Sequence, residues 1–223
     1  MSAVTPRAVV AEAIGSLILF ATVVGSGVMA EQLSGGNVAV ALLANTAATG
    51  AVLYVLITLL GPISGAQFNP AVTLMLGERR QWLPHIAAQL IGGIAGVLIV
   101  HAMFDMPLMQ VSDKVRTGPG QWLGEFVATF GLLFTIVIGS RQRPDALPAL
   151  VALWIVAGYW FTSSTSFANP AITVARALTD SFAGIRPIDA PGFIGAQLVG
   201  AWGGARVADW LTPTVAHQKQ ASI

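Results

Sequence analysis

The tripeptide Asn-Pro-Ala occurs twice in this chain, as Asn69, Pro70, Ala71 and as Asn169, Pro170, Ala171. Asn is a favoured helix N-cap, and Pro fits the first helical position because its missing N–H is not needed there. Each tripeptide therefore predicts the start of a helix, with unpaired N–H groups and about half a positive charge. Such helix starts can donate hydrogen bonds to the oxygen atom of a passing solute and can repel cations.

The duplication decides between two interpretations of these asparagines. An ordinary cap, satisfied by its own helix, explains either copy but not the coincidence of two. If both helix starts face one lumen, the two amides can donate to the same solute. We therefore expect Asn69 and Asn169 to lie within a few ångströms of one another across a shared lumen.

Two carboxylates, Glu12 and Glu125, lie within strongly apolar stretches. An ionisable group inside a membrane segment is by default a functional hypothesis, and a proton relay is one interpretation. The other is structural, with each carboxylate accepting hydrogen bonds from loop N–H groups. The matching sequence positions of the two residues and the absence of a nearby basic partner favour the structural interpretation.

The elements that must position these residues are membrane helices. The chain is 55% apolar and 9% charged, whereas a soluble domain carries about 25% charged residues. The net charge of +1 and the lack of a basic patch make nucleic acid an unexpected partner. A helix needs about 20 residues to cross the hydrocarbon core. Six stretches predict spans: Ala8–Ala30, Asn37–Leu60, Trp82–Phe104, Gln121–Ser140, Asp145–Thr162 and Ala190–Leu211.

The two remaining segments, 61–81 and 163–189, each hold one Asn-Pro-Ala and are too short to cross and return as full helices. Re-entrant half-helices are the economical interpretation. The first span resembles the fourth, the third resembles the sixth with Gln89 matching Gln197, and FNPAVT matches ANPAIT one hundred positions later. Two repeats, about 8–104 and 121–212, thus form one channel domain over 1–223. Since each repeat holds three spans, the second is inverted, and the half-helix starts meet near the midplane.

Orientation follows from the basic residues, which concentrate on the cytoplasmic side of membrane proteins. With both termini inside, seven Lys and Arg fall on the cytoplasmic side and four outside. The cytoplasmic seven are Arg7, Arg79, Arg80, Arg141, Arg143, Arg206 and Lys219. The sequence therefore predicts a multi-pass protein of the cell (inner) membrane with both termini in the cytoplasm.

The chain resembles the aquaporins, also called the major intrinsic protein family. SGAQFNPAVTL, the paired Glu12 and Glu125, the paired Gln89 and Gln197 and the six-span inverted plan all match, over essentially the whole chain. The resemblance implies a homotetramer in the lipid bilayer with one pore per subunit. It also implies that Asn69 and Asn169 line the central constriction, and that Glu12 and Glu125 are structural.

The expected selectivity filter departs from that of many family members. Many have Arg three positions after the second motif Asn, where this chain has Ile172. Water-selective members tend to have Phe and His at positions that here, by ungapped counting, hold Thr49 and Ala157, and the fourth position is Ser166. We therefore expect a wide filter of Thr49, Ala157, Ser166 and Ile172, without charge or large aromatic ring.

The segment around the second motif looks most like a bacterial subgroup associated with arsenic resistance, which implies permeation of arsenite-like neutral solutes. Arg176 follows Ile172 by one helical turn and could reach the outer mouth. An ion pair between Arg176 and Asp180 is the plainer expectation, and we favour it.

The leading hypothesis is a passive channel for water and small uncharged solutes of glycerol or arsenite size. A water-selective channel is the alternative. A secondary transporter that carries protons on Glu12 or Glu125 would share the inverted repeat. An intramembrane enzyme lacks a nucleophile and base signature, so no catalytic residue is expected. A structural junction protein would leave the filter unexplained. No cofactor or metal site is expected, since the three His lack a ligand spacing.

Overall fold

The computed structural model describes residues 4–213, and this part of the chain is folded into helices without strands. Six helices are long, and two of seven residues each begin at the Asn-Pro-Ala tripeptides. The long helices are α1 (Pro6–Leu33), α2 (Val38–Ser64), α4 (Arg79–Met103), α5 (Pro119–Gln142), α6 (Leu147–Phe161) and α8 (Ala190–Leu211). The short ones are α3 (Pro70–Leu76) and α7 (Pro170–Arg176).

The helix ends follow local sequence signals. Asn37 caps α2 by accepting hydrogen bonds from two backbone N–H groups, and Thr5 caps α1. The second helix continues past the predicted end, through Pro62 to Ser64, and stops where Gly65 adopts φ = 89°. A short 3-10 turn, Pro144–Ala146, precedes α6, so the helix of the fifth predicted span begins at Leu147 and not at Asp145. Within residues 4–213, five segments are long and apolar enough to cross a membrane, and α8, of 22 residues, is the remaining long helix.

Close helix crossings in the two repeats depend on glycine pairs. A Cβ atom on Gly92 or Gly96 of α4 would lie 2.1 or 2.3 Å from a backbone oxygen of α1. The same holds in the second repeat, where Gly200 and Gly204 of α8 meet backbone oxygens of α5 at 2.4 and 2.1 Å. Only glycine allows the backbones to approach this closely, and small residues serve this role in membrane helix packing.

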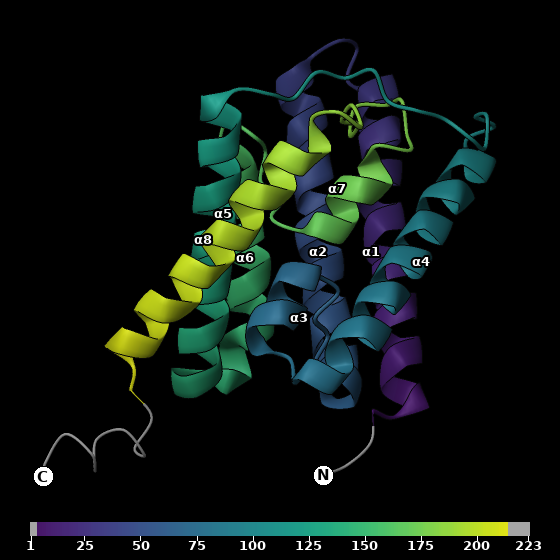
Figure 1. Ribbon diagram of the computed structural model, residues 1–223. Coiled ribbons are helices and arrows are strands. Elements are labelled where there is room, and N and C mark those ends of the chain that lie inside the picture. The colour runs from purple at the N-terminus through teal and green to yellow at the C-terminus, as the bar shows by residue number, and fades with distance from the viewer. Residues whose placement is uncertain (1–3, 214–223) are drawn as a thin grey trace, which may run out of the picture.

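The two repeats run in opposite directions, and the half-helices meet inside the bundle. In Figure 1, α1 rises from the end of the bundle at which α5 finishes. The short α3 lies in the half of the bundle below α7, and both contact α4 and α8. The predicted plan of six long helices and two half-helices in an inverted repeat is confirmed. Of the basic residues used for orientation, Lys219 lies outside the described residues.

Candidate functional site

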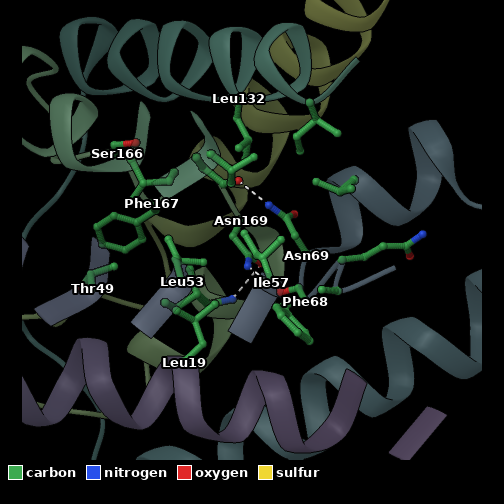
Figure 2. A pocket seen from close by; sticks show the side chains of 18 of the residues that line it. Leu19, Thr49, Leu53, Ile57, Phe68, Asn69, Leu132, Ser166, Phe167 and Asn169 are labelled. Carbon is green, nitrogen blue, oxygen red and sulfur yellow. Dashed lines mark hydrogen bonds between the residues drawn. The ribbon is translucent and has the colours of Figure 1, made fainter. Parts of the chain in front are cut away.

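The two motif asparagines join the half-helices start to start. Each Oδ1 caps its own helix by accepting a backbone N–H two residues on, at 2.9 Å. The amide nitrogen of Asn69 donates to the carbonyl of Ala168 at 2.7 Å, and that of Asn169 donates to the carbonyl of Phe68 at 2.8 Å. Each amide thus bonds the residue that precedes the other Asn, and Figure 2 shows the two asparagines next to each other.

The loop before α3 is anchored by a fully buried carboxylate. Glu12 of α1 accepts the backbone N–H of Gln67 at 2.9 Å and that of Phe68 at 2.7 Å. It also accepts the Ser64 hydroxyl at 2.7 Å and the amide of Gln89 at 2.8 Å. These four donors satisfy a carboxylate that burial would otherwise penalise.

The loop before α7 has the same anchor. Glu125 of α5 accepts the backbone N–H groups of Phe167 and Ala168, both at 2.8 Å, and the amide of Gln197 at 2.6 Å. Both glutamates are fully buried, and neither lines the cavity described below. Their geometry suits a fixed structural anchor, with every bond running to loop or helix donors.

Backbone strain in these two loops is also symmetric. Ala66 and Phe68 before α3, and Ser166 and Ala168 before α7, have positive φ between 47° and 53°. Such conformations cost about 1 kcal/mol or more for residues with a Cβ and persist only where the surroundings impose them. The glutamates hold the N–H groups of Phe68 and Ala168, and the hydroxyls of Ser64 and Ser164 accept those of Ala66 and Ser166. The strained segments place polar backbone on the cavity wall.

A cavity of about 110 Å³ passes between the two half-helix starts. One face of α6 lines it at every fourth residue, over about 18 Å at 1.5 Å per residue. Figure 2 shows Asn69 and Asn169 among apolar side chains that surround this space. The α6 residues are Leu147, Val151, Ile155 and Tyr159, and the α2 residues are Thr49, Leu53 and Ile57. The wall is thus mainly apolar. Polar groups lie at the half-helix starts and at the end of the cavity beside α7, called the α7 end below, where Thr49, Tyr159, Ser166 and Arg176 line it.

Three of the four predicted filter residues, Thr49, Ser166 and Ile172, line this cavity. The prediction for Ala157 is wrong, because this residue is exposed on the outer surface and Tyr159 lines the cavity instead. Side chains two positions apart in a helix point in directions about 200° apart. A count that is wrong by two positions therefore selects a residue on the opposite face of the helix. The Tyr159 hydroxyl lies 3.3 Å from the Thr49 hydroxyl, which brings a large aromatic ring to the α7 end.

The expected ion pair between Arg176 and Asp180 is also wrong. The side chain of Arg176 is 3% exposed, lines the cavity and forms no salt bridge among residues 4–213. Its Nε donates to the carbonyl of Ala183, and its guanidinium lies 3.3 Å from the centre of the Phe167 ring. The α7 end is therefore neither uncharged nor without aromatic rings, contrary to expectation.

Sequence reasoning missed three residues of this region: Tyr159, Phe167 and Arg116. Arg116 comes from the segment between α4 and α5, and its guanidinium lies 5.1 Å from the Phe167 ring centre. The spacing of four from Leu147 to Tyr159 was the available signal for Tyr159, but α6 is apolar on every face, so the cavity face does not stand out. No cluster of three His, Cys, Asp or Glu fit for a metal occurs among the described residues.

Comparisons with known proteins agree with this fold. Residues 1–158 match the model of a family described as Major intrinsic protein. The chain is 53% identical over 210 residues to Aquaglyceroporin AqpS of Rhizobium meliloti, covering 92% of this chain and 90% of that protein. It is 32% identical to Probable aquaporin AqpM of Archaeoglobus fulgidus, over 64% of this chain and 67% of the relative. The fold matches the crystal structure of the aquaglyceroporin from Plasmodium falciparum with a TM-score of 0.69 at 18% identity, covering 95% and 97% of the chains.

Proposed function

The chain belongs to the major intrinsic protein family, and on that premise we propose that it is a passive transmembrane channel for water and glycerol-sized uncharged solutes. One observation carries the proposal: a cavity runs between two half-helix starts whose asparagines both line it. Solute oxygens can exchange bonds with water for bonds with the motif amides and the strained loop backbone. No covalent chemistry is involved.

The constriction is assigned to the two tripeptides, with Asn69 and Asn169 as the donors. The positive ends of both helix dipoles point at this constriction. A cation that enters it loses hydrating water and is repelled by the two helix ends. We assign the filter to the α7 end, with Thr49, Tyr159, Ser166 and Ile172 on its wall and Arg176 as the charged member. Hydroxyl and guanidinium groups facing apolar side chains suit a small polyol.

Arsenite-like solutes fit the same chemistry, because undissociated arsenite is a small neutral molecule with several hydroxyl groups. The similarity to a protein named aquaglyceroporin supports solutes larger than water. The ring of Tyr159 and the buried Arg176 are bulky side chains that line the α7 end, and they support a water-selective channel as the second candidate.

The helices and the family identify an integral membrane protein, and we propose a homotetramer in the lipid bilayer, one channel unit per chain. Large apolar side chains on the helix surfaces are exposed in the single chain, as lipid or subunit contacts require. The inner membrane, with both termini in the cytoplasm, is the proposed location, on the charge distribution of the sequence.

Stopped-flow light scattering on proteoliposomes of the purified protein tests the function. We expect water, glycerol and arsenite flux above that of empty vesicles, unchanged when a proton or sodium gradient is imposed. Flux of water alone would support the water-selective candidate and contradict the wider one. Flux that follows the proton gradient would contradict a passive channel and return Glu12 and Glu125 to consideration as carriers.

A further inference from the structure

Two arginine side chains at the α7 end hold positive charge without a carboxylate partner. Arg176 is buried in the cavity wall, and Arg116 is half-buried beside the same aromatic ring. Neither takes part in any salt bridge found among residues 4–213. Those salt bridges join Arg80 to Glu78, Arg141 to Asp209, Arg143 to Asp145 and Arg186 to Asp189.

Neutral groups hold the two guanidiniums in place. Arg116 donates to the carbonyls of Gly184 at 2.8 Å and Ser164 at 3.4 Å, and Arg176 donates to Ala183. Both stack near the ring of Phe167, whose electron-rich face attracts cations. Carbonyl dipoles and a ring quadrupole stabilise the charges but do not neutralise them. The buried Glu125 attracts both guanidiniums, but one carboxylate cannot neutralise two arginines, so positive potential remains at this end of the cavity.

The terminal nitrogens of Arg176 are free for a ligand. Only its Nε has a hydrogen-bond partner among the described side chains and backbone, while the side chain lines the cavity. A guanidinium presents its donors as a planar fork that matches a carboxylate with two parallel hydrogen bonds. The hydroxyls of Thr49 and Tyr159 line the same cavity and can donate to the same ligand.

The acidic groups around this end are turned to other partners. Asp180 is exposed and accepts the backbone N–H of Asp113 at 3.4 Å. Asp189 accepts both the Arg186 guanidinium and the backbone N–H of Arg116. None of these carboxylates lines the cavity, so none of them occupies the free donors of Arg176.

We propose that the α7 end of the cavity is a binding site for a small monocarboxylate, with the Arg176 fork as its principal donor. Arg116 adds positive potential, and the Thr49 and Tyr159 hydroxyls bond the ligand from the wall. The site goes beyond conduction of uncharged solutes, because a bound anion occupies the passage and slows them. Recognition depends on charge as well as shape, so a neutral molecule of the same shape binds far more weakly.

The test compares formate with formamide, its uncharged counterpart, on the tetramer or monomer as purified in detergent. Formate at constant ionic strength raises the thermal unfolding midpoint in a saturable way, and formamide at equal concentration does not. Arg176→Gln raises the apparent dissociation constant of formate by about tenfold or more, since a charged hydrogen-bond pair is lost. Arg176→Lys keeps the charge without the planar fork, so its dissociation constant for formate should lie between those of the wild type and of Arg176→Gln.

Arg186→Gln is the matched control, because this arginine is half-buried, paired with Asp189 and absent from the cavity wall. It should leave the formate response unchanged. The proposal would be overturned if formate stabilised Arg176→Gln as much as the wild type, or if formamide stabilised the wild type as much as formate does. If Arg176→Gln does not fold, water flux in wild-type proteoliposomes is measured instead. We expect formate to lower this flux and formamide to leave it unchanged. Water flux that formate does not change would contradict the proposal.

Discussion

The anchors of the two half-helices are built alike, while the surroundings of their loops differ. In both, a buried glutamate accepts two consecutive loop N–H groups and a glutamine amide from a neighbouring helix. That glutamine also donates to a half-helix threonine at 2.9 Å in each repeat, Thr73 in one and Thr173 in the other. The scaffold is therefore symmetric down to individual hydrogen bonds.

Gln67 and Phe167, one hundred positions apart, show where the symmetry ends. The Gln67 oxygen accepts the Thr73 hydroxyl at 2.8 Å and lies 3.3 Å from Nδ1 of His85, so this loop is held by an uncharged amide. Phe167 instead lies beneath the guanidiniums of Arg116 and Arg176. The comparison shows that repeated residues build the passage and unrepeated residues give its α7 end a distinct chemistry.

The largest expected effect comes from removing either anchor. Glu12→Ala and Glu125→Ala each leave two loop N–H groups buried without a partner, at a cost of about 3 kcal/mol or more. We expect both to lose most folded protein, measured by the yield of monodisperse protein and the thermal midpoint in detergent. Glu31→Ala is the control, because Glu31 is exposed. If one anchor tolerates alanine and the other does not, the two halves are energetically unequal.

Glycine replacements test the symmetric helix crossings. Gly92→Ala and Gly204→Ala each place a Cβ 2.1 Å from a backbone oxygen of the neighbouring helix. We expect each to destabilise the fold by about 1–3 kcal/mol, since two backbones must separate. Gly195→Ala, where a Cβ meets nothing within 4 Å, should be neutral. Equal midpoints for all three variants in a thermal unfolding assay would contradict the close-packing interpretation.

Arginine placed three residues after each motif asparagine tests where selection occurs. Ile172→Arg adds bulk and charge beside Tyr159 and Arg176, and we expect glycerol flux to fall roughly tenfold with a smaller loss of water flux. Val72→Arg, the equivalent change in the first repeat, should reduce both fluxes alike, because the α3 end is not the proposed filter. Stopped-flow assays of both solutes measure this difference. Proportional losses in Ile172→Arg would argue against the filter assignment.

A smaller effect separates Tyr159 from Ala157. Tyr159→Ala removes a ring from the cavity wall and its contact with the Thr49 hydroxyl, so we expect glycerol flux to rise a few-fold. Ala157→Leu should leave flux unchanged, because residue 157 is exposed on the opposite face of α6. The reverse pattern in glycerol stopped-flow traces would restore the sequence-based assignment of Ala157.

The smallest effect is a pH dependence confined to the α7 end. Hydrogen bonds from Arg186 lower the pKa of Asp189, which also accepts the backbone N–H of Arg116. A carboxylate whose pKa is lower in the folded state adds stability above its unfolded value of about 3.9, and that stability is lost at more acid pH. We expect Asp189→Asn to lower the thermal midpoint by a few degrees at pH 7 and to have less effect near pH 3. A constant difference across this range would show that ionisation is irrelevant.

Local chemistry let the sequence predict the architecture. Asn followed by Pro is a local signal for a helix start, and both pairs in this chain cap a helix. The six apolar stretches match helices, and the repeat implied an inverted second half. Glu12, Glu125, Gln89 and Gln197 were found because repetition marks them. These inferences need only short-range rules and the periodicity of hydrophobic residues, which act before any tertiary contact forms.

Tertiary structure alone decided the chemistry of the α7 end. The face of α6 that meets the cavity depends on loop length and helix rotation, and apolar residues on all sides of α6 give no periodic signal, so Tyr159 was missed. Arg176 lies beside Arg116 only because a segment from before α5 packs over the loop after α7. Contacts between residues far apart in the chain are set by packing, which single-residue propensities do not encode.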